Sequence, residues 1–159
     1  MSYNPLRLQT EQYTVPAVVG EVKDRSARIR MQTAIDVGVL KIMEPTKDSR
    51  NRVIMQSMQL GDMDKLSVAD LDVLALTLDL TSSGQKCLLI TDDYAVQNIA
   101  NTLRISFKSL VAHGIRNQFI WRLHCPACGR TYRPNFREKA CPVCGTILRR
   151  KVVKKKKVE

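Results

Sequence analysis

The sequence predicts an α/β domain, in which helices flank a mainly parallel sheet, followed by a small cysteine-rich module. Short apolar, strand-like runs alternate with helical segments between Tyr13 and Phe107, an order typical of parallel sheets. Residues 87–90 form a continuous apolar run, as expected of a strand buried on both faces. Two Cys-Pro-x-Cys-Gly motifs stand near the C-terminus, outside this alternation. Together these observations indicate two structural units.

The first half of the chain contains two predicted strands and two predicted helices. Residues 13–15 form a short strand, and Pro16 then suits the first turn of a helix, since its missing N–H is not needed there. This helix is expected to run to about Val37. Residues 39–43 alternate like a strand, and residues 46–60 look helical until Gly61-Asp62 ends them.

The next helix has the clearest start signal. Ser67 is its predicted N-cap, with Asp70 three positions on as the capping-box partner. Its apolar residues recur every three or four positions, as on one face of a helix: Val68, Leu71, Leu74, Ala75 and Leu78. After the apolar run 87–90, a helix is expected from Tyr94, and one more strand around Ile105 and Phe107.

Charge divides the chain. Residues 1–100 hold 11 Lys/Arg and 13 Asp/Glu, whereas residues 101–159 hold 15 Lys/Arg and 2 Asp/Glu. A basic part of this kind favours nucleic acid as the partner. No apolar run approaches the roughly 20 residues of a membrane span, and the first ten residues do not resemble a signal peptide. We therefore expect a cytoplasmic protein with no membrane partner, in which reduced thiols favour metal binding over disulfides.

The cysteine pairs predict a structural zinc site. Cys125, Cys128, Cys141 and Cys144 form two knuckles separated by twelve residues, and each second cysteine is followed by glycine. Four thiolates close a tetrahedral site without an open position, which is typical of structural zinc. The alternative is that these cysteines pair or stay unused. Cys87 stands alone in an apolar run and is expected in the core.

Basic and aromatic side chains surround the knuckles. Guanidinium groups suit phosphates, and aromatic rings suit unstacked bases, although at least one ring is expected in the small core. The aromatic candidates are Trp121, Tyr132 and Phe136. The predicted RNA-binding residues are Arg122, Arg130, Arg133, Arg137, Arg149 and Arg150.

Four carboxylates are candidates for a second metal site. Asp92 and Asp93 follow the apolar run 87–90, at the sheet edge where α/β proteins bind ligands. Asp70 and Glu21 lie in the first turns of predicted helices. Carboxylates that converge there can hold Mg²⁺ or Mn²⁺. Each also has an ordinary role: Asp70, Asp92 or Asp93 as helix caps, and Glu21 as an exposed residue paired with Arg25.

Three segments carry a resemblance to a known family. Residues 13–22, 66–76 and 91–100 resemble the PIN-domain nucleases. Joined to a C-terminal zinc ribbon, they are similar to the Nob family of ribosome-biogenesis endonucleases in its short archaeal form, over nearly the whole chain. This resemblance implies a Mg- or Mn-dependent endoribonuclease that matures the 3′ end of precursor small-subunit ribosomal RNA, with no small-molecule cofactor.

The resemblance also implies roles for single residues. Glu21, Asp70 and Asp93 match the family's metal-binding carboxylates, with Asp92 beside them, and the metal would activate water for attack on a phosphate. Asn98 matches a position that supports this site. The expected units are a PIN-like domain over 1–112, a linker over 113–120, the zinc ribbon over 121–150 and a basic tail over 151–159 that is disordered at its end.

One family feature is not found in the sequence. The family begins with an apolar strand that ends in Asp, and no such run precedes Tyr13. Either the numbered chain starts late or this copy is catalytically weakened. Two alternatives therefore stay open: a non-catalytic RNA- or ribosome-binding factor, and a toxin-type PIN ribonuclease, although such toxins usually lack a ribbon.

Overall fold

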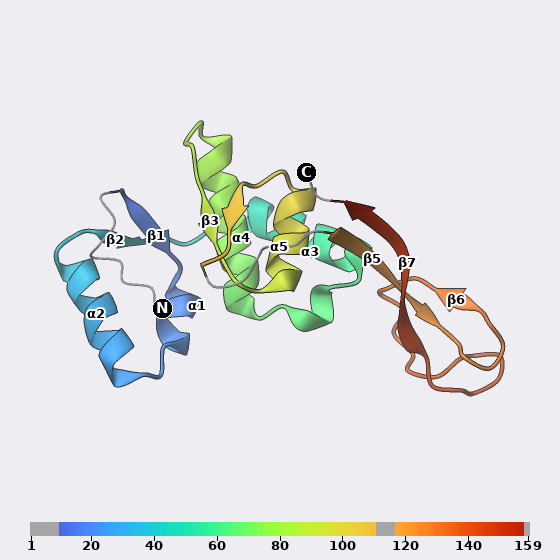
Figure 1. The fold of residues 1–159 in the computed structure, drawn as a ribbon. Coiled ribbons are helices and arrows are strands. Elements are labelled where there is room, and N and C mark those ends of the chain that lie inside the picture. Colours follow the sequence, from blue (N-terminus) through green and yellow to red (C-terminus); the bar gives the residue numbers. More distant parts are fainter. Residues whose placement is uncertain (1–9, 111–116, 158–159) are drawn as a thin grey trace.

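The computed structural model describes residues 10–110 and 117–157 (Figure 1). Helices and strands occur in the predicted order. Within these residues, every helix is too short or too polar to span a lipid bilayer. The elements are β1 (Gln12–Thr14), α1 (Pro16–Glu21), α2 (Arg25–Asp36), β2 (Leu40–Ile42), α3 (Lys47–Leu60), the 3₁₀ helix η2 (Met63–Lys65), α4 (Val68–Ser82), β3 (Leu89–Ile90), α5 (Tyr94–Thr102), β4 (Phe107–Lys108), β5 (Asn117–His124), β6 (Thr131–Tyr132) and β7 (Arg149–Lys157).

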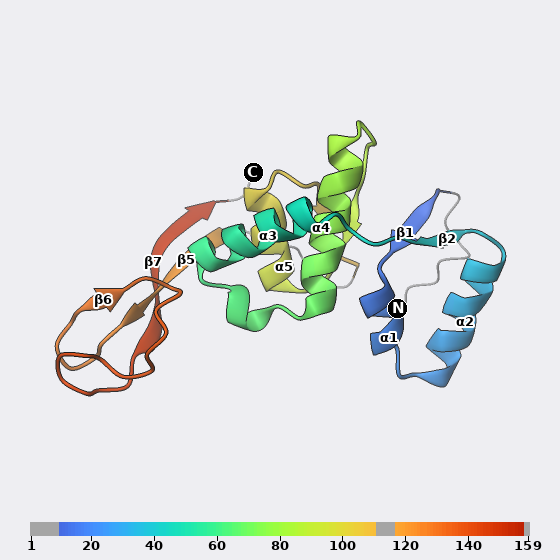
Figure 2. The ribbon, with the colours of Figure 1, turned by 180° about the vertical axis from the view of Figure 1, so that it is seen from behind.

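The predicted parallel pairing is confirmed, but it is divided into two pairs. β1 pairs with β2 in parallel, from Gln12 opposite Leu40, and β3 pairs with β4 in parallel. Among the described strands these pairs form separate sheets. Figures 1 and 2 show β1 and β2 with α1 and α2 at one end and α3 to α5 in the middle. The strands β5 to β7, which we call the arm, lie at the other end. The family's first strand is not found in the sequence before Tyr13, and residues 1–9 of that segment lie outside the described residues.

The single helix predicted from Pro16 to Val37 is instead two helices, α1 and α2. The break lies between Val22 and Asp24, because Asp24 acts as the N-cap of α2 and accepts a 2.7 Å hydrogen bond from the Ala27 amide. Arg28 holds the other side of the break by donating to the Val22 carbonyl oxygen at 2.9 Å. When a side chain caps the backbone amides of a new helix, the preceding helix does not continue through that residue.

Helix α4 is the centre of the main core. Val53 of α3, Leu74 of α4 and Ile99 of α5 are each fully buried in one cluster. The predicted stripe of α4 is buried from Leu71 onward, whereas Val68 in the first turn is 66% exposed. This arrangement fixes the helix that carries Asp70 relative to the helix that follows Asp93.

Polar contacts reinforce the packing of α3 against α4. Arg50 makes a two-pronged ion pair with the buried Asp72, with Nε–Oδ1 and Nη2–Oδ2 distances of 2.7 and 2.8 Å. Asp79 accepts hydrogen bonds from Thr46 and Ser49 at the start of α3. The hydrophobic pattern does not indicate these pairs, because they join residues far apart in the chain.

The C-terminal module is a three-stranded antiparallel sheet in the order β6–β5–β7. Asn117 lies opposite Lys157 and His124 opposite Arg149, with a bulge at Ile120/Trp121. The predicted linker and tail therefore need correction: β5 begins inside 113–120, and residues 151–157 form a strand. The ladder to β5 pairs the backbone groups on the side of this lysine-rich segment that faces β5, and composition alone does not predict this pairing. Residues 113–116 and 158–159 lie outside the described residues.

Candidate functional site

The four predicted cysteines meet in one cluster. Their sulfur atoms all lie within 4.8 Å of one another, with Cys125–Cys144 and Cys128–Cys141 Sγ–Sγ distances of 3.4 and 3.6 Å. These distances exclude disulfides, whose S–S bond is about 2.05 Å. Zn–S bonds of about 2.3 Å in a tetrahedron separate the sulfurs by about 3.8 Å. The donor set and its spacing fit a zinc ion.

The two knuckles have the same backbone geometry. The amide of Gly129 donates to the Cys125 carbonyl oxygen at 3.0 Å, and the amide of Gly145 donates to the Cys141 carbonyl oxygen at 2.8 Å. Both glycines have positive φ, 74° and 70°, which side chains with a Cβ rarely adopt. The first cysteine of each knuckle is buried and the second is exposed.

Tyr132 belongs to the core of this module. Its hydroxyl group lies 3.0 Å from Cys141 Sγ, and its ring stacks on Phe136 with centroids 4.8 Å apart. This hydrogen bond lowers the pKa of Cys141 to about 6 and raises the pKa of Tyr132 to about 12. A thiol poised to lose its proton suits metal binding.

Asp70 and Asp93 both act as helix caps in the structure. One oxygen of Asp70, Oδ2, accepts bonds from the amide and hydroxyl groups of Ser67, both at 2.9 Å. Asp93 Oδ1 accepts from the amides of Ala95 and Val96 at 2.6 and 3.1 Å. Among the described residues, no hydrogen-bond donor contacts Asp70 Oδ1 or Asp93 Oδ2. Each carboxylate therefore keeps one oxygen that a cation could use.

The other two carboxylates lie in different settings. Glu21 is the last residue of α1 and is exposed. Asp92 is exposed, accepts from the Leu110 amide at 3.0 Å, and is also hydrogen-bonded to the Ser109 hydroxyl group. In the part of the chain that the structure describes, only the cysteines form a group of three or more metal-binding side chains within 4.8 Å. The carboxylate site of Glu21, Asp70 and Asp93 thus stays a prediction.

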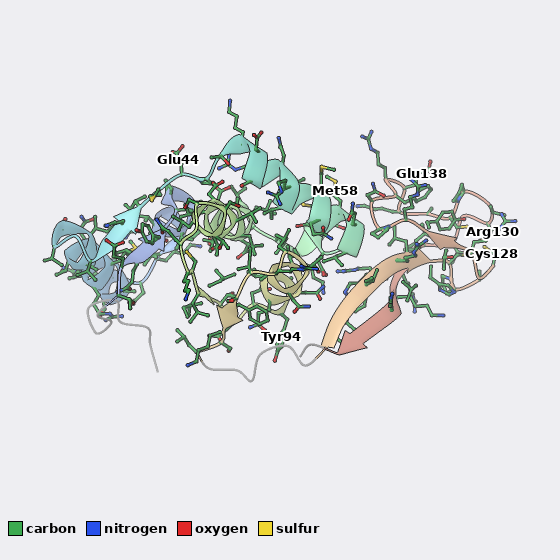
Figure 3. All side chains as sticks on the ribbon, turned by 90° about the horizontal axis from the view of Figure 1, so that it is seen from above. Glu44, Met58, Tyr94, Cys128, Arg130 and Glu138 are labelled. Carbon is green, nitrogen blue, oxygen red and sulfur yellow. The ribbon has the colours of Figure 1, made fainter. Side chains whose placement is uncertain are left out.

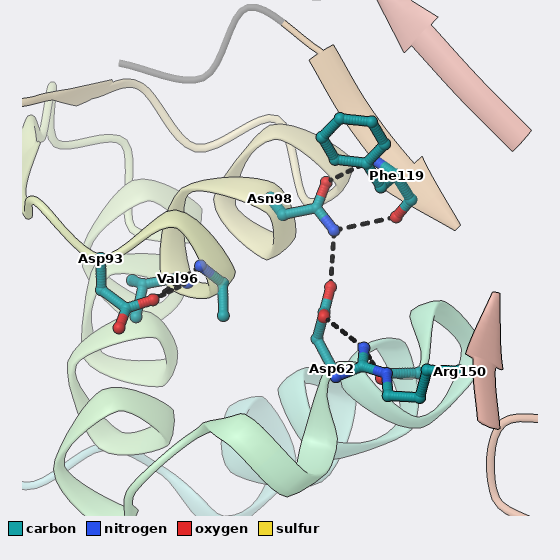
Figure 4. A network of polar contacts seen from close by, with 8 residues as sticks. Asp62, Asp93, Val96, Asn98, Phe119 and Arg150 are labelled. Atoms are coloured by element: carbon teal, nitrogen blue, oxygen red, sulfur yellow. Dashed lines mark hydrogen bonds and ion pairs between the residues drawn. The ribbon is translucent and has the colours of Figure 1, made fainter. Parts of the chain in front are cut away.

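Asn98 has a role that sequence reasoning missed. It is buried in α5, and its Nδ2 donates to Asp62 Oδ2 at 2.6 Å and to the Phe119 carbonyl oxygen at 3.0 Å. Its Oδ1 accepts from the Phe119 amide at 3.2 Å. Asp62 is also buried and forms an ion pair with Arg150 at 2.9 Å (Figure 4). We call Asp62, Asn98, Phe119 and Arg150 the docking network.

This network changes the interpretation of two predicted RNA-binding side chains. Arg150 contacts Asp62 and the Gly61 carbonyl oxygen, so its guanidinium group is used within the chain. The Trp121 ring lies between Lys65 Nζ, at 5.2 Å, and Arg150 Cζ, at 4.7 Å. We therefore give both residues a structural role. The sequence showed Gly61-Asp62 only as a helix end, because the partner of Asp62 lies far along the chain.

The other predicted basic residues are exposed: Arg122, Arg130, Arg133, Arg137 and Arg149. Arg122 lies opposite Lys151, and His124 lies opposite Arg149. Since residues two apart share a face of a strand, these four side chains form one face of the arm, which we call the outer basic face. Figure 3 shows Cys128 and Arg130 at the tip of the module, at the opposite end of the arm from Tyr94.

Comparisons with known proteins match both parts of this architecture. The family model described as the PIN domain of ribonuclease matches residues 3–80. "Endoribonuclease Nob1" of Methanocaldococcus jannaschii is 38% identical over 152 residues, which cover 96% of this chain and 73% of the relative. The same-named protein of Pyrococcus abyssi is 39% identical over 142 residues, 89% of this chain and 84% of the relative.

A eukaryotic relative matches a shorter stretch. The "20S-pre-rRNA D-site endonuclease NOB1" of Saccharomyces cerevisiae is 38% identical over 68 residues, which are 43% of this chain and 15% of that protein. The archaeal matches extend over most of both chains, and the 152 residues matched to the Methanocaldococcus protein are enough of this chain to include the cysteine module as well as the PIN-like part. The chain therefore belongs to the Nob1 family of PIN-domain endoribonucleases.

Proposed function

We propose that this chain cuts precursor small-subunit ribosomal RNA at its 3′ end during ribosome biogenesis. The observation that carries this proposal is the match to archaeal Nob1 endoribonucleases over 89–96% of the chain. The name of the yeast relative specifies a precursor ribosomal RNA as the substrate of that protein. The precursor RNA, or the small subunit that contains it, is the proposed partner.

The proposed active site consists of Glu21, Asp70 and Asp93, with Asp92 beside them. Bound Mg²⁺ or Mn²⁺ would supply an activated water and charge stabilisation at the phosphate. Asp70 and Asp93 suit this role because one oxygen of each caps a helix and so fixes the side chain, while the other accepts no hydrogen bond from the described residues. The products would carry a 5′-phosphate and a 3′-hydroxyl group.

The cysteine module would hold RNA rather than cut it. A zinc ion bound by Cys125, Cys128, Cys141 and Cys144 would keep the loops folded. The exposed guanidinium groups of Arg130, Arg133 and Arg137 in these loops, and the outer basic face, would contact phosphates. Regular spacing along the two strands suits a phosphate backbone, since the contacts need no particular base.

The substitution Asp93→Asn tests the proposed activity. Asparagine caps helices about as well as aspartate, so α5 keeps its start while the metal loses a charged ligand. We expect the variant to bind an RNA fragment that spans the precursor 3′ end but to lose Mn²⁺-dependent cleavage. Asp64→Asn, at an exposed carboxylate in η2, is the matched control and should cleave normally. Parent-level cleavage by Asp93→Asn would disprove the site.

A second candidate function is RNA binding without cleavage. The observation that favours it is the separation of Glu21, Asp70 and Asp93, which do not form a group within 4.8 Å. In the same assay, a non-catalytic factor would bind the fragment and leave it intact at any Mn²⁺ concentration. Cleavage that Asp93→Asn abolishes would rule this alternative out.

A further inference from the structure

Asn98 holds β5 as a neighbouring strand would. Its amide group donates to the Phe119 carbonyl oxygen and its carbonyl group accepts from the Phe119 amide, so both backbone polar groups of one residue meet one side chain. A buried side-chain amide with this pair of bonds fixes both the position and the direction of the strand. The contact joins a helix of the nuclease part to the first strand of the arm (Figure 4).

Asp62 ties the same helix to the second long strand of the arm. It accepts from Asn98 through Oδ2 at 2.6 Å and from Arg150 through Oδ1 at 2.9 Å. Its side chain is 3% exposed and that of Arg150 is 27% exposed. A buried carboxylate needs such partners, and removing one leaves an uncompensated charge. The docking network therefore engages β5 and β7 at once.

Close packing accompanies these polar contacts. A Cβ added at Gly61 would lie 2.8 Å from Pro134 Cβ and 3.2 Å from Trp121 Cβ, so the turn after α3 touches the arm and one of the cysteine-module loops. The φ of Gly61 is 77°, which independently favours glycine. The arm therefore contacts the nuclease part at several points, and these contacts limit its rotation relative to that part.

Helix α5 connects the docking network to the proposed active site. Asp93 is its N-cap and Asn98 lies five residues further along it. We infer that Asn98, Asp62 and Arg150 are positioning residues. They set the distance between RNA bound to the cysteine module and the proposed active site at Asp93, and so select the phosphodiester that is cut. This inference rests on the proposed function. A displacement of about 1 Å can cost about 100-fold in rate, so a loosely seated arm would spread cleavage over neighbouring positions.

The test uses the full chain, three variants of the docking network and one control variant. Asn98→Ala removes both bonds to Phe119, and Arg150→Met removes the ion pair while keeping an aliphatic stem. Arg52→Met is the control, because it removes the same charge from an exposed position of α3 that belongs neither to the docking network nor to the outer basic face. Arg150→Lys keeps the charge and should restore part of the parent behaviour.

Amide hydrogen exchange gives the readout that is independent of activity. We expect the Phe119 amide to exchange about tenfold faster in Asn98→Ala, the effect of one lost hydrogen bond in a local opening. Arg52→Met should leave that rate unchanged. Zinc content should stay at the parent level in every variant, since no cysteine is altered. Unchanged Phe119 exchange in Asn98→Ala would overturn the docking role.

Mapping of the cut positions on the precursor fragment gives the second readout. We expect one main product end for the parent and for Arg52→Met, and several neighbouring ends for Asn98→Ala and Arg150→Met. Slower cleavage at one unchanged position would mean a merely structural role and would overturn the selection of the phosphodiester. If the parent itself makes no cut, the proposed function and the selection fail together, while hydrogen exchange still decides whether the arm is docked.

Discussion

The hydroxyl group of Tyr132 lies 3.0 Å from Sγ of Cys141, so a core ring of the cysteine module touches one of the four sulfur atoms directly. The same ring stacks on Phe136, and the two aromatics pack against the buried cluster of Cys125, Cys141 and Leu148. The hydrophobic centre of this module is therefore built around the sulfur cluster. Such a small centre depends on a metal for most of its stability.

We expect about one zinc ion per chain and its loss on mutation of a ligand. Cys128→Ser should release zinc and unfold the loops between β5 and β7, because three ligands no longer close the tetrahedron. Elemental analysis and circular dichroism would measure both effects. Cys87→Ser is the control, since Cys87 packs against the separate cluster of Val15, Leu76 and Leu80. Full zinc occupancy in a Cys125/Cys141 double variant would contradict the site.

RNA affinity should depend steeply on salt. Each phosphate contact adds about 0.7 to the slope of log affinity against log salt for single-stranded and about 0.9 for double-stranded nucleic acid. Arg122→Met and Arg149→Met, both on the outer basic face, should each lower the slope by about this amount without changing sequence preference. Arg52→Met removes an exposed charge from α3 and should leave the slope unchanged. Equal slopes for all three variants would show that the outer basic face does not contact phosphate.

Stability should depend on Asp79 at neutral pH. Burial raises the pKa of Asp79, but hydrogen bonds from Ser49 and Thr46 outweigh it and hold that pKa below its usual range. A carboxylate with a depressed folded pKa stabilises the protein above its unfolded pKa, and this contribution is lost as the pH falls through the folded pKa. The acid range is therefore where this stabilisation disappears.

Asp79→Asn should lower the free energy of unfolding at pH 7 by about 1–2 kcal/mol, allowing for solvent screening of a partly exposed group. The difference from the parent should shrink as the pH falls below about 4, the ordinary pKa of aspartate, and through the lower pKa that Asp79 has in the folded protein. Urea unfolding at pH 7 and pH 3 would measure both values. Asp64→Asn should leave the free energy of unfolding unchanged at both pH values. A pH-independent difference for Asp79→Asn would mean that the charge of Asp79 does not contribute to stability.

Local signals explain which parts of the fold were predictable. The capping box of Ser67 and Asp70, the apolar run up to Ile90 and the cysteine spacing each lie within one short segment, and the structure has α4, β3 and the sulfur cluster at these places. The helix break at Val22–Asp24 was missed because Asp24 looked like any charged helical residue.

Features that depend on distant partners were not predictable. The sequence of residues 151–157 suggests a charged tail, because the segment becomes a strand through its pairing with the distant strand β5. Asp62 and Asn98 lie 36 positions apart, and neither residue's neighbours in the sequence show that it becomes buried. The same limit applies to Glu21, whose predicted role rests on the family resemblance rather than on its own segment.

The end of the molecule that carries Glu21 should open before the rest. Within residues 10–110 and 117–157, β1 and β2 form a two-stranded sheet, and a sheet of two strands is marginally stable by itself. Val15, Leu76 and Leu80 are the buried residues of the small cluster that attaches β1 and α1 to α4. The Met43 amide, which donates to the Thr14 carbonyl oxygen at 2.9 Å, should therefore exchange at least about 100-fold faster than amides in the middle of α4.

This local opening provides a test of Glu21 as a metal ligand. A cation bound to Glu21 together with Asp70 or Asp93 would link α1 to α4 or α5, and it would stabilise the closed form by mass action. Saturating Mg²⁺ should then slow exchange in α1 and at Met43 while leaving α2 unchanged. Glu21→Gln keeps the size of the side chain and should abolish the effect, whereas Glu11→Gln, at another exposed carboxylate of the same end, should retain it. Protection by Mg²⁺ that survives in Glu21→Gln would place the cation elsewhere, and no protection in the parent would remove Glu21 from the proposed site.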